Sequence, residues 1–166
     1  MDDLHKKYDT SKLRQVSLSL IWDERKILLA MKKRGFGEGL WNGYGGKQKE
    51  SETIEETAIR ETNEEIGINS TEIEQVGTLS FFFEGVPSDQ NWNQKAVIFR
   101  INKWVGDPVE SEEMKPKWFD ISDIPYDKMW PDDRIWLPKI LKGMKLECIF
   151  VFDADKRLKE SNIKVL

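Results

Sequence analysis

The stretch that decides the fold prediction reads GKQKESETIEETAIRETNEEIGI and runs from Gly46 to Ile68. Residues 53–66 are rich in good helix formers, and Gly67 follows at the position where glycine commonly ends a helix. The sequence therefore predicts a helix over 53–66. The segment before it, 35–46, contains six glycines and is expected to form irregular backbone with close approaches.

Three glutamates of the predicted helix lie on one face, because a rotation of about 100° per residue places them within an arc of roughly 100°. They are Glu61, Glu64 and Glu65. Like charges at this spacing destabilise a helix by a few tenths of a kcal/mol per pair. Carboxylate oxygens that converge outside the core would suit Mg²⁺ or Mn²⁺, and a bound cation would turn the repulsion into attraction. For these residues alone, a solvated acidic face is the alternative.

A wider pattern surrounds the three glutamates. Gly46 is followed after five residues by Glu52, and seven further residues lead to RETNEEIGI. This spacing resembles the Nudix box, G-x5-E-x7-R-E-U-x-E-E-x-G-U, in which U is a bulky aliphatic residue. Thr62 departs from the pattern, on the side of the helix that we expect to face the core. The chain is therefore similar to the Nudix hydrolases.

This resemblance implies an α/β Nudix fold, an α/β/α sandwich around a mixed β-sheet. A single domain would span 1–166, with the box at 46–68, and with 1–13 and the C-terminal tail at the periphery. The implied activity is Mg²⁺-dependent hydrolysis of a nucleoside diphosphate linked to a further group, with Mn²⁺ as a substitute cofactor. The implied metal ligands are Gly45, Glu61, Glu64, Glu65 and Glu113, and Arg60 joins the three helical glutamates as a catalytic residue. Glu52 is expected to hold the box loop by pairing with Arg60.

Outside the box, three stretches resemble one subgroup, the oxidised-purine nucleoside triphosphate hydrolases. They are MKKRGFGEGLWNGYGGK (31–47), PVESEEMKPKWF (108–119) and MWPDDRIWLP (129–138). The resemblance implies cleavage between the α- and β-phosphates of 8-oxo-dGTP or 2-hydroxy-dATP, which yields a monophosphate and pyrophosphate.

The same resemblance implies a base pocket and a phosphate path. Substrate-binding residues carried over are Ser17, Lys32, Phe36, Asn42, Tyr44, Gly45, Gly46, Lys47, Phe81, Phe83, Trp130, Pro131, Asp132 and Asp133. Among these, Trp130 would stack on the base. Asp132 and Asp133 would bind its edge, and adjacent buried carboxyls share a proton as a pair. Moving that proton would let one pocket read two oxidised bases.

Four departures from the subgroup concern the pocket. Ser17 stands in place of a threonine, and Tyr44 replaces a phenylalanine. The loop 86–94 is about four residues longer, and Gln94 falls where a pocket-lining methionine is expected. A polar side chain there would shift the preference among modified purines.

Composition narrows the other classes of function. The net charge of −4 disfavours binding to nucleic-acid phosphates, and no apolar run approaches the roughly 20 residues of a membrane-spanning helix. The polar N-terminus shows no secretory signal, so we expect a cytoplasmic monomer, with nuclear or mitochondrial nucleotide pools also open. His5, the single histidine, argues against His-based triads and zinc sites. Cys148, the single cysteine, lies in the apolar run CIFVF and is expected to be a buried thiol.

Strands are predicted over 15–22, 27–31, 76–85, 95–104, 117–121 and 145–153, and a second helix over 131–144. Interleaved strands and helices indicate a layered α/β domain.

Two other functions stay open. One is a Nudix hydrolase for ADP-ribose, a dinucleotide or an alkylated purine triphosphate. The other is a nucleotide-binding module with damaged catalysis, which the intact helical glutamates argue against.

Overall fold

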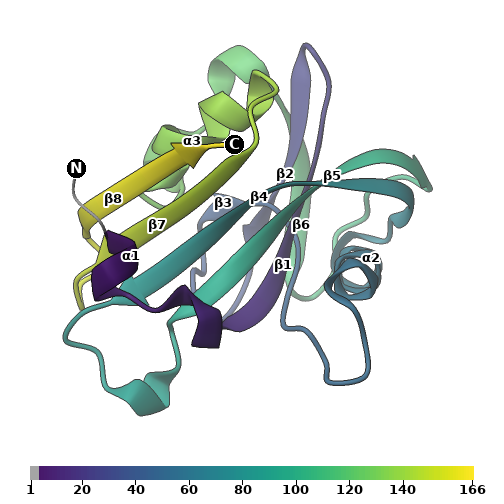
Figure 1. Ribbon diagram of the computed structural model, residues 1–166. Helices are drawn as coiled ribbons and strands as arrows, with labels where there is room; N and C mark the ends of the chain where they lie inside the picture. The colour runs from purple at the N-terminus through teal and green to yellow at the C-terminus, as the bar shows by residue number, and fades with distance from the viewer. Residues whose placement is uncertain (1–3) are drawn as a thin grey trace.

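A mixed β-sheet forms the centre of the computed structural model, which describes residues 4–166 (Figure 1). The strands are β1 (Arg14–Trp22), β2 (Lys26–Lys32), β3 (Trp41–Asn42), β4 (Asn69–Phe83), β5 (Gln94–Val105), β6 (Met114–Asp120), β7 (Leu146–Phe152) and β8 (Leu158–Val165). Their order is β3-β2-β1-β5-β4-β7-β8, and β6 pairs with β2. The β1/β5 and β4/β7 pairs are parallel and the other pairs are antiparallel. All six predicted strands are present, and β4 begins earlier than predicted.

The first long helix, α2 (Ile54–Ile66), covers one face of the sheet. Thr53 caps its N-terminus in a capping box with Glu56, and Gly67 ends it in the left-handed region at φ 74°. Ala58 packs with Val97 and Phe99 of β5. The predicted helix and both of its boundaries are therefore confirmed.

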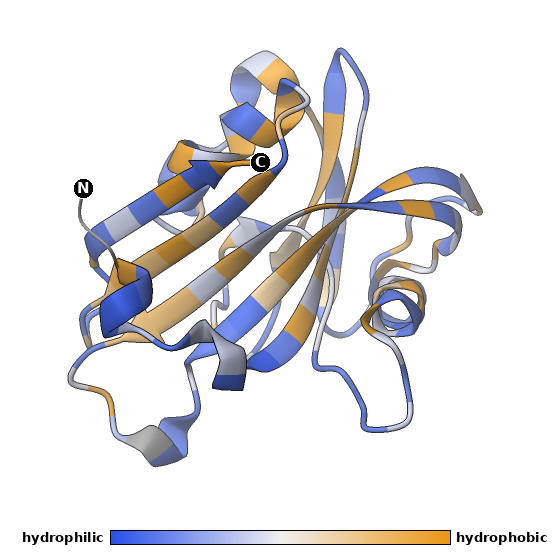
Figure 2. Cartoon of the chain, in the orientation of Figure 1, coloured by the Kyte–Doolittle hydropathy of each residue, from blue (hydrophilic) through white to orange (hydrophobic). Residues whose placement is uncertain are grey.

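The second long helix, α3 (Asp133–Leu141), packs on the opposite face. Its buried residues Trp136, Leu137 and Ile140 belong to the main core with residues from β1, β4, β5 and β7. Figure 2 shows the hydrophobic residues concentrated along the central strands, whereas the loop that leads into α2 is hydrophilic. The predicted α/β/α sandwich is confirmed, and α3 is shorter than the predicted 131–144.

A separation between β1 and β2 creates room for a site. These strands pair only at Ile21–Leu28 and Trp22–Ile27. Nearer the N-terminal end of β1, the segment 43–47 lies beside the strand in place of β2. It is bound there by backbone hydrogen bonds such as the one from Ser19 N–H to Tyr44 O, at 2.7 Å. The glycine-rich segment is thus fixed against the sheet next to the box helix.

Both ends of the chain are more integrated than the sequence indicated. The short helix α1 (Leu4–Lys7) places Leu4 against Phe82, where its side chain is only 2% exposed. At the other end, the tail forms β8, the edge strand beside β7. The described ends therefore lie at the edge of the domain and are ordered, since each covers apolar surface or backbone of the sheet.

Short 3₁₀ helices complete the described chain: Thr10–Lys12, Ser88–Gln90, Ile121–Asp123 and Tyr126–Lys128. Cys148 is buried on β7 and unpaired, as predicted, and burial raises its pKa to about 12. None of the helices in residues 4–166 has both the length and the apolar character needed to cross a membrane.

Candidate active site

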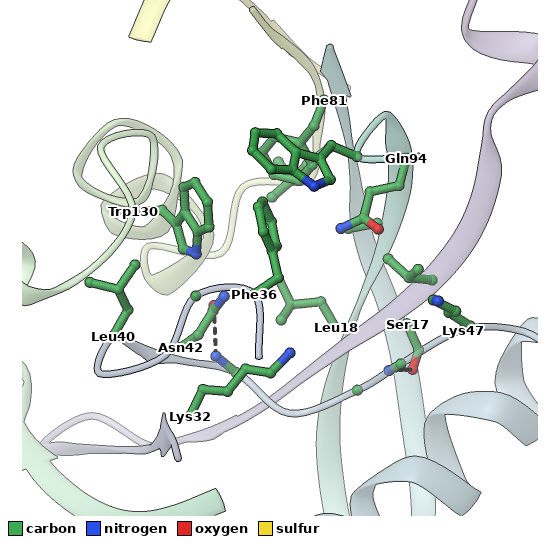
Figure 3. Close-up of a pocket in the computed structure, with 18 of the residues that line it drawn as sticks. Ser17, Leu18, Lys32, Phe36, Leu40, Asn42, Lys47, Phe81, Gln94 and Trp130 are labelled. Atoms are coloured by element: carbon green, nitrogen blue, oxygen red, sulfur yellow. Dashed lines mark hydrogen bonds between the residues drawn. The ribbon is translucent and has the colours of Figure 1, made fainter. Parts of the chain in front are cut away.

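One cavity of about 430 Å³ lies where β1, the glycine-rich segment and the start of α3 meet (Figure 3). This volume is in the range of small-molecule pockets. The predicted site residues that line it are Ser17, Lys32, Phe36, Asn42, Gly45, Gly46, Lys47, Glu65, Phe81, Phe83, Trp130, Asp132 and Asp133. The sequence therefore names about half of the lining residues, from both ends of the cavity.

Aromatic rings form one wall of the cavity. Phe36 packs against Trp130 with ring centroids 5.1 Å apart, and Phe83 meets Trp130 edge-on at 6.4 Å. Strand alternation on β4 turns Phe81 and Phe83 to the cavity and Phe82 to the opposite face, where it packs with Leu4. Flat rings of this kind suit stacking with a nucleobase.

Asn42 offers a hydrogen-bond donor to the cavity. Its Oδ1 accepts the backbone N–H of Gly43 at 2.8 Å, shown by the dashed line in Figure 3. The oxygen is thereby engaged, and the amide nitrogen stays available for a ligand.

The two aspartates of WPDD are buried in the cavity wall at the start of α3, each 2% exposed. Asp132 Oδ2 accepts the indole N–H of Trp136 at 2.9 Å, and its side chain makes no helix-capping bond. Asp132 Oδ1 and Asp133 Oδ2 are buried without a partner among the described residues. Capping, the ordinary use of aspartate here, is therefore not what Asp132 does.

Burial changes the acidity of this pair. Desolvation raises the pKa of Asp132 to about 6. The pKa of Asp133 lies well above its usual value because of desolvation and the neighbouring Asp132. Without a cation beside them, the two carboxyls are expected to share a proton at neutral pH.

The glutamates of α2 lie in three different environments. Glu65 is 5% exposed and accepts the N–H of Gly45 at 2.8 Å, whereas the side chain of Glu64 is 56% exposed and that of Glu61 is 18% exposed. The pKa of Glu65 is raised to about 8, mainly by desolvation and further by the charges of Glu61 and Glu113.

Arg60 links the box loop to the helix, as predicted. Its Nε and Nη2 donate to both oxygens of Glu52 at 3.0 and 2.6 Å, and the pKa of Glu52 falls to about 2, first because of Arg60. The same guanidinium bonds Glu61 at 2.8 Å and Glu64 at 3.3 Å. Arg60 is thus the cation between the helical carboxylates in this side-chain arrangement.

The predicted convergence of the metal carboxylates stays a prediction, because several of them are paired with arginines in this side-chain arrangement. In residues 4–166, no three acidic, histidine or cysteine side chains stand close enough together to hold an ion. Glu61 turns toward Arg60, and Glu113 pairs with Arg34 at 3.3 Å. These pairings with Arg60 and Arg34 are contacts that helical spacing alone does not predict.

Two glycines allow the loop to pass close to β1 and the glutamates. A Cβ on Gly45 would overlap the backbone oxygen of Ser17, and a Cβ on Gly46 would lie 2.5 Å from Cδ of Glu61. Glycine is therefore required by the backbone of β1 at position 45, whereas a larger residue at position 46 would displace the Glu61 carboxylate.

Two predicted substrate residues lie outside the cavity. Tyr44 is fully buried, donates its hydroxyl to Leu28 O at 3.2 Å, and pairs both backbone groups with Ser19. Pro131 is exposed and does not line the cavity. Neither side chain lines the cavity, because Tyr44 packs in the core and Pro131 is exposed, and their roles in substrate binding stay predictions.

Other lining residues were missed by sequence reasoning. Arg14, Trp92 and Phe152 line the cavity, as do several small or aliphatic side chains. The length of the 86–94 loop was the only signal that could have indicated Trp92, since nothing local shows where a loop folds back. Gln94, noted at the site of an expected methionine, does line the cavity.

The residues around Glu65 fit a divalent cation. Glu65 is a desolvated carboxylate that its neighbours Glu61 and Glu113 repel, and a cation would relieve both costs. Oxygen donors of this kind match hard ions such as Mg²⁺.

This combination of box, sheet and carboxylate helix defines a class of enzyme. The NUDIX domain family matches residues 12–140, and the chain belongs to the Nudix hydrolases. Enzymes of this family in general use divalent metals.

Named relatives cover most of the chain. It is 44% identical over 149 residues to a mouse protein named oxidized purine nucleoside triphosphate hydrolase, covering 89% of this chain and 93% of that one. A zebrafish protein of the same name is 42% identical over 145 residues, covering 87% and 89%. Among solved structures, a MutT protein from Bacillus halodurans has a TM-score of 0.78 at 26% identity and covers 92% of this chain and 98% of its own.

Proposed function

We propose that this Nudix hydrolase cleaves oxidised purine nucleoside triphosphates, such as 8-oxo-dGTP and 2-hydroxy-dATP, to the monophosphate and pyrophosphate with Mg²⁺. One observation carries the proposal: a single cavity contains the aspartate pair and aromatic wall at one end and Glu65 at the other. A base bound at the first end would place its phosphates toward the second. The shared name of the mouse and zebrafish relatives supports the same substrate class.

At the base end, Trp130 supplies a stacking surface that is worth roughly 1–3 kcal/mol and discriminates little between bases. Selectivity rests on buried polar partners, because leaving one unpaired is costly. Asn42 donates to the base edge, whereas each aspartate donates when protonated and accepts when ionised. The shared proton gives one pocket two patterns of donors and acceptors, which suits both an oxidised guanine and an oxidised adenine.

At the phosphate end, the cation would be held by Glu61, Glu64 and Glu65, with the backbone oxygen of Gly45 and with Glu113. When bound, it neutralises phosphate charge and promotes attack by water. Glu61 and Glu113 would have to exchange their arginine partners for it. Arg60, which is bound to Glu52, fixes the position of the box loop relative to the helix. Lys32 and Lys47 add positive charge on the cavity wall.

The test is pyrophosphate release by the purified protein from 8-oxo-dGTP, 2-hydroxy-dATP, dGTP and dATP, each with Mg²⁺ and with excess chelator. We expect release only with metal. We also expect kcat/KM on the oxidised nucleotides to exceed that on the unmodified ones by about tenfold or more, the size of a buried hydrogen-bond mismatch. Comparable values for dGTP and 8-oxo-dGTP would leave a Nudix hydrolase without the proposed specificity.

A further inference from the structure

The extended loop is fixed to the sheet next to the cavity. Arg14, at the start of β1, donates from Nη2 to the backbone oxygen of Asn91 at 2.7 Å and to Oε1 of Gln94 at 3.3 Å. The backbone N–H of Phe83 donates to Asn93 Oδ1 at 2.8 Å. These bonds hold the end of the loop from two strands, β1 and β4, so that its cavity-facing residues have defined positions.

Arg14 determines which way the Gln94 amide points. A guanidinium has only donors, so the Gln94 atom that faces it must be the oxygen. The two N–H groups of Gln94 therefore face the other way, and Figure 3 shows the amide nitrogen on the side toward Phe36. Within the described residues, the hydrogen bonds of this side chain involve its oxygen only.

Because the surroundings of the Gln94 amide are largely apolar, its two unbonded N–H groups matter for the affinity of a bound base. Gln94 lines the cavity together with the apolar side chains of Leu18, Phe36 and Trp92. Trp92 packs on Phe36 with ring centroids 5.0 Å apart. A base bound here would displace water from the amide, and an amide without a new acceptor would then weaken binding.

We propose that Gln94 is a second base-reading residue, which donates a hydrogen bond from Nε2 to an exocyclic oxygen of the modified purine, and that Arg14 is the residue that positions it. The proposal rests on the proposed function and adds to it. Gln94 recognises an oxygen that the damaged base has and the normal base lacks, whereas the aspartate pair reads the rest of the base edge.

Two pairs of nucleotides that differ in a single oxidised position give the test: 8-oxo-dGTP with dGTP, and 2-hydroxy-dATP with dATP. For each variant, kcat/KM is measured on all four, and the ratio of oxidised to normal nucleotide is compared with that of the unsubstituted protein. Gln94→Met keeps the length of the side chain but removes the donor. We expect it to lower this ratio about tenfold for at least one pair. The pair that is affected shows whether Gln94 binds the added oxygen of the oxidised guanine or that of the oxidised adenine.

Three further variants separate recognition of the base by hydrogen bonding from packing. Gln94→Glu keeps the shape of the side chain and offers only acceptors. The ratio of kcat/KM for the oxidised nucleotide to that for the normal one should therefore fall at least as much as in Gln94→Met. Arg14→Met leaves the amide free to turn and should lower that ratio by about threefold, and Arg14→Lys, which can still donate to Oε1, should restore most of it. Gln75→Met, on an exposed part of β4, is the matched control and should leave every ratio unchanged.

Binding gives a readout that does not depend on turnover. Tryptophan fluorescence, with Trp92 and Trp130 in the cavity wall, is used to titrate the four monophosphates in the presence of chelator. Gln94→Met should lose the preference for the oxidised monophosphate of the same pair. Ratios within about twofold of the unsubstituted protein for both pairs, in Gln94→Met and in Gln94→Glu, would overturn the proposal. If the unsubstituted protein hydrolysed none of the nucleotides, the proposed function would fail, and the binding arm would still decide the role of Gln94.

Discussion

Two groups of carboxylates differ in their surroundings: the box glutamates, of which Glu65 lines the cavity, and the aspartate pair in the cavity wall. On α2, Arg60 bonds Glu52, Glu61 and Glu64, so positive charge is already built in among the acids. At the start of α3, Asp132 and Asp133 are both buried, and the hydrogen-bond partner of Asp132 is a neutral indole. Arg60 holds the pKa of Glu52 low, at about 2, whereas burial raises the pKa values of Asp132, Asp133 and also Glu65, so that these carboxyls favour a proton or a bound cation.

This difference shows that local acidity follows the surroundings more than the residue type. Carboxylates with a cationic partner and access to water can exchange that partner for a metal ion. Carboxyls enclosed by aromatic and aliphatic groups avoid the cost of two buried charges by protonation, and thereby become donors. Under the proposed function, one kind of side chain would serve catalysis on α2 and recognition of the base at the start of α3.

The largest expected effect is on the metal side. Glu61→Gln keeps a hydrogen-bond acceptor for Arg60 but removes the charge, so we expect kcat/KM to fall about a hundredfold or more on every substrate, because the metal contributes several kcal/mol. The measurement is pyrophosphate release across a Mg²⁺ titration. Glu55→Gln, on the first turn of the same helix, is the control. A loss smaller than about threefold would contradict a metal role for Glu61.

A selective effect is expected on the base side. Asp132→Asn and Asp133→Asn each fix one pattern of donors, so the ratio of kcat/KM for 8-oxo-dGTP to that for 2-hydroxy-dATP should change by about tenfold in at least one variant. Glu61→Gln should leave this ratio unchanged while it lowers both values. An unchanged ratio in both asparagine variants would remove the shared proton from the account of specificity.

The buried pair also predicts a pH dependence of stability. Because the pKa of Asp132 is raised to about 6, the folded protein binds more protons than the unfolded chain above about pH 4, and the free energy of unfolding falls as the pH rises through 6. Between pH 5 and 7.5, Asp132→Asn should lose less stability than the unsubstituted protein, by on the order of 2 kcal/mol. Urea unfolding at several pH values, with chelator present, measures this difference. Parallel pH profiles would contradict it.

The smallest effect concerns the outer side of the aromatic wall. Lys156, in the turn between β7 and β8, holds its Nζ 4.9 Å from the ring centre of Phe36, 5.3 Å from that of Trp92 and 6.0 Å from that of Trp130. Exposed cation–π contacts contribute about 0.5–1 kcal/mol, so Lys156→Met should raise KM about two- to fivefold with little change in kcat. Lys156→Arg should keep the contact and a near-normal KM. An equal KM in both variants would show that the charge is not needed.

Local features were predictable wherever their cause is local. The helix over 53–66, its capping glycine and the spacing of Glu52 and Arg60 follow from residue propensity and from the helical repeat. The inward turn of Phe81 and Phe83 follows from strand alternation. The burial of Tyr44 was not predictable, because it depends on hydrogen bonds to Ser19 and Leu28, which are distant in sequence.

The sequence by itself determined the class of enzyme and the position of its carboxylate helix, because both depend on spacing along one continuous segment. Only the tertiary structure decided that Glu65 is buried while Glu64 is exposed, that Glu113 pairs with Arg34, and that the 86–94 loop reaches the cavity. Burial and ion pairing are sums over neighbours from many segments, and the helical repeat of a single segment does not contain them.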